Sequence, residues 1–241
     1  MDSRAAWSSS FDKLRMRSNS NPGTRSTQAR VHEKFWKSGS TSAKLAPMTE
    51  FQRCTWRGMN GDPFYEAYHD DEWGVPEYDS RALWEKLVLD GFQAGLSWIT
   101  ILRKREAFRA AFANFDPDTV ARFGDADRAR LMADAGIIRS NGKIDAAISG
   151  AKIYCGMRDR GEDLSDLLWG MVGGKPIQGA WLGGDVPAQT PLAVDMAKML
   201  KAKGYKYCGP VIVYAFMQAT GLVNDHLTTC FRHEACRKLA R

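Results

Sequence analysis

Two cysteines and two histidines have the types and spacing of metal ligands. His226 and Cys230 are four residues apart, so on a helix they would share one face. Cys54 and His69, much earlier in the chain, complete a set of two thiolates and two imidazoles, which zinc prefers in closed tetrahedral sites. Such a site would tie the two ends of a domain together. The alternative is that the cysteines are merely buried and that the histidines are core or surface residues.

The remaining cysteines do not suggest disulfides. The chain has five cysteines and no visible secretory signal, and an odd number without export argues against a disulfide framework. His233 and Cys236 continue the metal-ligand pattern, but we interpret them as part of a frayed C-terminal tail.

A second group of chemically capable residues surrounds Asp90. Residues 89–98 (LDGFQAGLSW) combine this carboxylate with two glycines and Trp98, and the glycines permit the close approach of a backbone or a ligand. Four further aromatic side chains accumulate earlier in the chain: Trp56, Tyr65, Tyr68 and Trp73. They suggest a stacking pocket beside a carboxylate. A helix–helix crossing with an ordinary aromatic core would give the same pattern.

A glycine-rich turn over residues 203–210 (KGYKYCGP) separates two helical segments. Free backbone amides at the N-terminus of the second helix would suit a phosphate group. The alternative is an ordinary turn between helices.

Helices must position these residues. Asp79 and Ser80 are typical caps for a helix whose apolar side chains recur with helical spacing up to Phe92. Further helices are predicted over residues 98–112, from Asp116-Pro117, over residues 125–135 with Gly136 as the terminator, over residues 143–157 and over residues 192–203.

Two later segments are harder to interpret. Residues 211–220 contain β-branched side chains, but the apolar run continues to residue 223, which favours a buried helix over a strand. The Gly and Pro content of residues 170–191 predicts an irregular loop. Period-two alternation is scarce throughout, so the predicted fold class is all-α.

The positive charge is concentrated at the N-terminal end. The 241 residues carry a formal net charge of +6, and residues 1–47, with nine Lys/Arg and three Asp/Glu, account for all of it. This segment has the composition of a disordered basic extension. It is compatible with a nucleic-acid-binding arm, with an organellar transit peptide, or with an artefactual start upstream of Met48.

Six motifs occur in a characteristic order: CxW, DPxYxxYHDxEWG, QAGLSW, AGIIR, the GYKY turn and FMQAxGLVNDH. In these motifs, over about residues 51–230, the chain resembles the 3-methyladenine-DNA glycosylase I family. That family belongs to the helix-hairpin-helix glycosylases, so the resemblance implies an all-α, two-lobed fold with a DNA-facing cleft. It divides the chain into the extension over residues 1–47, a glycosylase domain over residues 48–236 and a tail over residues 237–241.

The resemblance also assigns roles to individual residues. One structural zinc ion per chain would be held by Cys54, His69, His226 and Cys230. The pocket for the methylated base would be formed by Trp56, Tyr65, Tyr68 and Trp98, with Asp90 as the catalytic carboxylate that recognises the base. Contacts with DNA would come from Gly95, from Leu96 as the residue pushed toward the gap left by a flipped nucleotide, and from Lys206 and Gly209 in the phosphate-gripping hairpin.

Three positions bear on how far the resemblance extends. The family's base-recognising carboxylate is usually Glu, and Asp90 retains the charge but reaches less far. Asn224 stands where related glycosylases carry a catalytic Asp, and we expect the neighbouring Asp225 to cap the helix that bears the zinc ligands. Lys206 is placed like a phosphate contact and not like the nucleophile of a lyase.

The resemblance therefore implies a DNA repair enzyme of the base-excision type, which flips 3-methyladenine out of double-stranded alkylated DNA and hydrolyses its glycosidic bond without lyase activity. We expect a monomer with a cytoplasmic, nucleoid-associated location and no membrane partner, since neither a spanning segment nor a signal peptide is visible. Two alternatives remain at this point: a zinc module that binds distorted duplex without cleaving it, and a glycosylase whose Asp90 has shifted it to another alkylated base.

Overall fold

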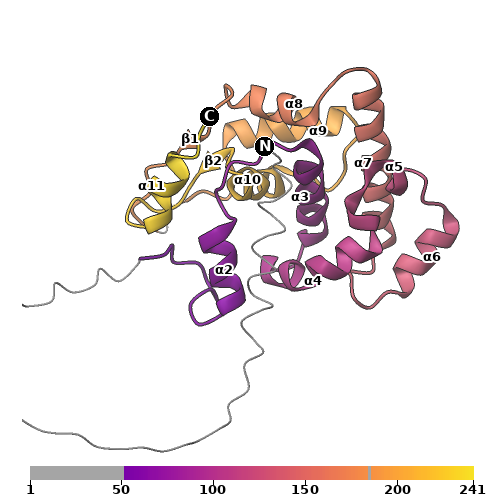
Figure 1. Ribbon diagram of the computed structural model, residues 1–241, viewed down its shortest axis with the longest axis horizontal. Helices are drawn as coiled ribbons and strands as arrows, with labels where there is room; N and C mark the ends of the chain where they lie inside the picture. Colours follow the sequence, from indigo (N-terminus) through magenta and orange to yellow (C-terminus); the bar gives the residue numbers. More distant parts are fainter. Residues whose placement is uncertain (1–51, 184–185) are drawn as a thin grey trace, which may run out of the picture. The chain divides into compact units, whose positions relative to one another are not determined.

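Helices form most of the regular secondary structure in the computed structural model, which describes residues 52–183 and 186–241 (Figure 1). In chain order they are α2 (Pro63–Asp71), α3 (Ser80–Gln93), α4 (Trp98–Ala111), the short 3-10 helix η1 (Ala113–Phe115), α5 (Pro117–Val120), α6 (Asp125–Ala133), α7 (Asn141–Asp159), α8 (Leu164–Met171), α9 (Pro191–Ala202), α10 (Pro210–Ala219) and α11 (Phe231–Arg237). The extension predicted over residues 1–47 lies outside the described residues.

Side-chain caps explain where several helices begin. The Asp79 carboxylate accepts a hydrogen bond from the amide of Ala82 at the start of α3. Asp116 accepts from the amide of Thr119 at the start of α5, and Pro117 fills the first helical position, where no amide donor is needed. Both starts confirm the sequence prediction.

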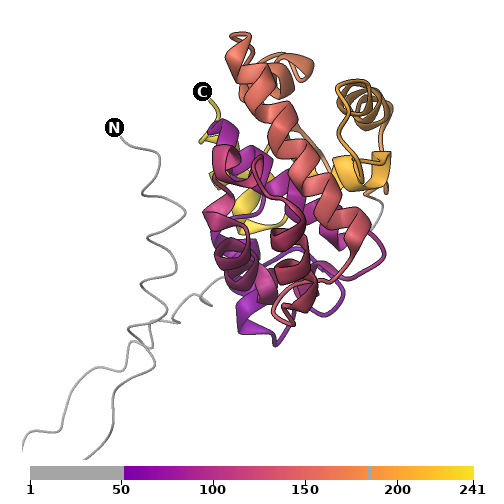
Figure 2. The same cartoon turned by 90° about the vertical axis from the view of Figure 1, so that its right-hand side faces the viewer.

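Helix α3 lies at the centre of the packing. It contacts α4, α7, α8 and α10, and its Trp84 and Phe92 side chains are almost completely buried. Helix α10 packs in turn against α9, the helix that precedes it in the chain. Figure 2 shows α7 as the long helix along one side of this arrangement. The buried position of α3 is what places Asp90, near its C-terminal end, inside the protein.

The prediction of a buried helix at residues 211–220 is confirmed by α10. Two short strands modify the all-α expectation: β1 (Ile177–Gln178) and β2 (Val223–Asn224) pair in parallel. Strand β1 falls in the predicted irregular loop, and β2 follows α10. Each strand has only two residues, which is too short to show an alternating pattern.

The predicted end of the helix at residues 125–135 is wrong. Helix α6 stops at Ala133, and Asp134 has an extended backbone. The Asp134 carboxylate accepts a hydrogen bond from the backbone amide of Gly136 at 2.7 Å, which forms an Asx turn. This turn, and not a glycine in the left-handed conformation, follows the end of the helix. Across residues 52–183 and 186–241, no helix is long and apolar enough to cross a membrane.

Candidate functional site

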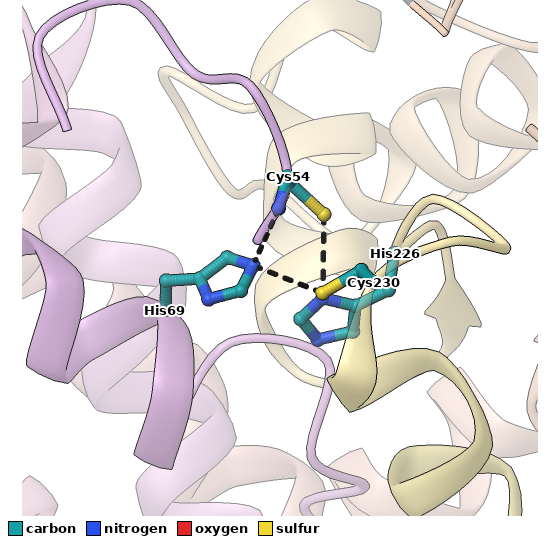
Figure 3. Close-up of side chains that lie close together, drawn as sticks. All are labelled: Cys54, His69, His226 and Cys230. Atoms are coloured by element: carbon teal, nitrogen blue, oxygen red, sulfur yellow. Dashed lines mark hydrogen bonds between the residues drawn. The ribbon is translucent and has the colours of Figure 1, made fainter. Parts of the chain in front are cut away.

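The four predicted metal ligands meet at one buried point. One ligand atom from each of Cys54, His69, His226 and Cys230 lies within 4.8 Å of all the others, and all four residues are buried. Figure 3 shows their side chains pointing toward one another, His69 from α2 and Cys54 from the extended segment before it. The Cys54 Sγ–His226 Nδ1 distance is 3.5 Å. Cys230 Sγ lies 3.6 Å from both His69 Nε2 and His226 Nδ1.

The local structure around His226 differs from the prediction. His226 and Cys230 do not share a helical face, because residues 225–230 form a turn and Cys230 is the N-cap of α11. His233 and Cys236 do not belong to a frayed tail either. Both lie in α11, where Cys236 is buried and His233 Nε2 is 2.9 Å from the carbonyl oxygen of Gly179. Neither belongs to the four-residue cluster.

The two histidines are oriented by hydrogen bonds at their outer ring nitrogens. His69 Nδ1 lies 2.8 Å from Asp70 Oδ1, and His226 Nε2 lies 2.9 Å from the carbonyl oxygen of Trp73. Both arrangements point the second ring nitrogen at the cysteines. Gly74 is required beside His226, because its φ is +79° and a Cβ atom there would lie 2.8 Å from His226 Nε2.

The donor set fits a metal ion of the zinc type. Zinc bonds of about 2.0–2.3 Å in a tetrahedron separate sulfur and nitrogen ligands by about 3.5 Å, close to the spacing between these side chains. Burial lowers the pKa of His226, which favours the neutral imidazole that binds metal. The hydrogen bond from the Cys54 thiol lowers the pKa of Cys230, which favours the thiolate form that binds metal.

A cavity of about 370 Å³ adjoins the cluster, since Cys54 contributes to its wall. Its aromatic lining consists of Trp56, Tyr65, Tyr68, Trp73 and Trp98. The structure thus brings the predicted stacking residues together. The rings of Trp56 and Tyr65, and those of Tyr68 and Trp98, have centroids 5.5 Å apart. Burial raises the pKa of Tyr68, whose phenol therefore stays protonated at neutral pH.

Asp90 lies in the wall of this cavity beside a buried lysine. Lys86 Nζ is 2.5 Å from Asp90 Oδ1, one helical turn away on α3, and both side chains are at most 4% exposed. The second oxygen, Asp90 Oδ2, is buried and has no hydrogen-bond partner. Burial raises the pKa of Asp90, while the Lys86 ammonium group opposes this shift. Sequence reasoning missed Lys86, although its four-residue spacing from Asp90 was a readable signal.

Asp225 does not cap a helix, contrary to the prediction. Its carboxylate accepts hydrogen bonds from Tyr214 Oη at 2.6 Å, Trp181 Nε1 at 2.8 Å and Gln218 Nε2 at 3.0 Å. Asp225 also contributes to the cavity wall. The turn at residues 225–230 leaves no helix start for it to cap, and the side chain instead connects the chain after β1 to α10.

The residues predicted to contact DNA lie in two turns, and Lys143 approaches both of them. Gly95 has a φ of +82° and precedes Leu96, whose side chain is 42% exposed. Lys206 is exposed in the turn between α9 and α10, and Gly209 is the N-cap of α10. Lys143 Nζ donates to the carbonyl oxygens of residues 92 and 94 and lies 6.0 Å from the ring of Tyr207, so it links the two turns.

Residues 56–233 match the sequence model of a family described as methyladenine glycosylase. The chain belongs to this family. It is 48% identical over 180 residues to DNA-3-methyladenine glycosylase 1 of Escherichia coli (strain K12), a match that covers 74% of this chain and 95% of that protein. The chain is therefore an enzyme that hydrolyses N-glycosidic bonds, and the alternative of a non-catalytic binding module is set aside.

Solved structures agree with this assignment. A crystal structure of 3-methyladenine DNA glycosylase I is 50% identical, with a TM-score of 0.74, and the match covers 76% of this chain and 100% of that chain. A tyrosine-to-phenylalanine variant of 3-methyladenine DNA glycosylase I, solved in complex with 3-methyladenine, is 38% identical with a TM-score of 0.70 and coverages of 72% and 94%. The mostly helical fold described above is thus the fold of this family.

Proposed function

We propose that the chain removes 3-methyladenine from double-stranded alkylated DNA by hydrolysis and leaves an intact strand with an abasic site. One observation carries the proposal: an aromatic cavity holds the buried carboxylate of Asp90, one oxygen of which has no partner. A buried acceptor without a donor is costly, and a ligand that donates a hydrogen bond there would remove that cost. The exocyclic amine of a flipped adenine-type base is such a donor.

The same cavity suits a cationic base. Methylation at N3 makes the adenine ring positively charged, and the faces of Trp and Tyr rings attract cations by about 0.5–2 kcal/mol. We place the base against Trp56, Tyr65, Tyr68 and Trp98, with its amine toward Asp90. Unmodified adenine would gain less from these rings while the enzyme still has to unpair it, which explains selectivity.

The charge of the substrate also explains why no strong acid is needed. When the C1′–N9 bond breaks, its electron pair goes to the base, which leaves as neutral 3-methyladenine. The sugar becomes an oxocarbenium ion, to which water adds with loss of a proton. The chain's own residues bind and orient the base, and the negative charge of Asp90 favours the cationic state over the uncharged base.

The metal, DNA and assembly assignments belong to the same proposal. Cys54, His69, His226 and Cys230 would hold one zinc ion, which stabilises the fold and takes no part in the reaction. The turn before α10 would hold a phosphate as part of a helix-hairpin-helix element in a two-lobed protein, and Leu96 would enter the gap left by the base. We further propose a monomer in the cytoplasm, associated with the nucleoid.

The test is product analysis on alkylated duplex DNA. Chromatography of the released bases should show free 3-methyladenine with little adenine, and a denaturing gel should show strand breaks only after alkaline treatment. Release of a different alkylated base would favour the alternative that Asp90 has changed the specificity. Covalent trapping of the enzyme on DNA by borohydride would contradict the absence of lyase activity.

A further inference from the structure

A buried lysine occupies the wall of a cavity that we propose for a cationic base. Lys86 contributes to the cavity wall, and its side chain is 4% exposed. A second positive charge in this place would weaken the binding of a cation unless it had a separate task. The contacts of Lys86 indicate what that task is.

The Lys86 ammonium group makes two contacts, both with residues of the proposed pocket. It donates to Asp90 Oδ1 at 2.5 Å, and it lies 4.0 Å from the centroid of the Trp98 ring. The first contact leaves Asp90 Oδ2 as the only carboxylate oxygen among the described buried side chains that has no partner. The second contact, with the face of the Trp98 ring, helps to hold the ammonium group in place beside Asp90.

Burial alone would favour the protonated form of Asp90, which could no longer attract a cation. The other charged groups around Asp90 do little to oppose this effect of burial. Arg105 on α4 is paired with Glu72 through hydrogen bonds of 2.5 and 2.8 Å, and Tyr68 on α2 stays protonated. Asp225, in the cavity wall, is itself a carboxylate. Lys86 is therefore the positive group placed to keep Asp90 charged.

We propose that Lys86 is a positioning residue for Asp90: it holds one carboxylate oxygen and keeps the group ionised, so that the second oxygen is available to the displaced base. This inference rests on the proposed function. It predicts that Lys86 acts on excision only through Asp90, and that the arginine variant, which keeps the charge, retains more activity than an apolar variant.

The experiment is a double-mutant cycle on the full-length protein with duplex DNA that contains 3-methyladenine. Single-turnover excision rates and melting temperatures are measured for the wild type, Lys86→Met, Lys86→Arg, Asp90→Asn and the Lys86→Met/Asp90→Asn pair. Lys86→Met should slow excision at least tenfold at neutral pH. In the Asp90→Asn background, where Lys86 has no Asp90 carboxylate to hold, the same change should alter the rate less than twofold.

The pH profile separates this role from a packing role. Without Lys86 the Asp90 carboxyl group loses its proton only at higher pH, so the acidic limb of the Lys86→Met rate profile should move upward and the loss should shrink as pH rises. Lys198→Met is the matched control, because Lys198 pairs with Asp195 within one helix but is 73% exposed. It should excise like the wild type.

The outcomes distinguish the two proposals. A wild-type protein that releases no 3-methyladenine contradicts the proposed function. An active wild type with an equally active Lys86→Met variant overturns the role of Lys86, as does an equal loss in both backgrounds. If Lys86→Met alone fails to fold because it leaves a buried charge unpaired, the double variant and Lys86→Arg still decide the matter, since both avoid that unpaired charge.

Discussion

The Asp225 carboxylate shows how one side chain can connect the cavity to the surrounding chain. Its three side-chain donors come from α10 and from the segment after β1, and its neighbour His226 belongs to the buried cluster of two cysteines and two histidines. Asp225→Asn keeps the size of the side chain but replaces one acceptor oxygen by an amide group, whose hydrogens would face the groups that now donate to the carboxylate. We expect the free energy of unfolding to fall by about 1–3 kcal/mol. Urea denaturation tests this, with the exposed Asp195→Asn as the control; equal stability of the two variants would contradict it.

For single residues, the sequence predicted which side chains belong to the candidate site better than it predicted what each side chain contacts. The four residues of the buried Cys54, His69, His226 and Cys230 cluster could be picked out because two cysteines and two histidines are the set that zinc prefers and because the family resemblance points to the same positions. The role expected for Asp225 was wrong because it assumed a helix at residue 226. His233 and Cys236 were wrongly placed in a frayed tail because helix α11 was not predicted. Lys86 was missed because a lysine on a helix is usually exposed, and only the packing of α3 shows that this one is buried.

Among the elements, the turn between α9 and α10 is the one we expect to bind the DNA backbone. Lys206→Ala removes an exposed positive charge from this turn. It should weaken DNA binding and lower the slope of log affinity against log salt by about 1, because one phosphate contact is lost. Excision at saturating enzyme should stay unchanged.

Binding titrations at several salt concentrations measure this slope. Lys152→Ala, at an exposed position on α7, is the control and should leave it unchanged. A Lys206→Ala variant with the wild-type salt dependence would remove the turn from the proposed DNA contact.

Most element starts were predictable because caps are local. Asp79 and Asp116 act within three residues of themselves, so their effect can be read from the sequence. The buried nature of α10 was also readable from the length of its apolar run. Helices α2, α8 and α11 were not predicted.

For the molecule as a whole, the cluster of Cys54, His69, His226 and Cys230 joins the two ends of the family domain, and we propose that it holds zinc. Removal of zinc should lower the melting temperature sharply, because a closed site contributes its binding free energy to folding. Gly74→Ala tests the geometry without removing a ligand, since the added methyl group would displace His226. It should lower both zinc content and melting temperature. A folded wild-type protein without zinc by metal analysis would contradict this assignment.

The N-terminal extension should be dispensable. Residues 52–241 form one compact unit, and the family match lies within it. A protein that begins at Met48 should therefore release 3-methyladenine at the full-length rate in moderate salt. The comparison uses single-turnover rates on the same duplex. A shortened protein that lost selectivity between alkylated and normal bases would show that the extension contributes to the pocket.

The central claim is that the buried carboxylate in the aromatic cavity recognises the damaged base. The direct measurement is the rate of 3-methyladenine release by Asp90→Asn and Asp90→Glu, with melting temperatures alongside. Asn keeps the shape but loses the charge, so excision should fall about tenfold to a hundredfold, in line with about 1.5–3 kcal/mol for a hydrogen bond to a charged group. Glu retains the charge and should remain active. Asn leaves the buried Lys86 ammonium group without its anion, so the melting temperature of Asp90→Asn should fall while the variant still folds. A folded Asp90→Asn protein that excises at the wild-type rate would contradict the account.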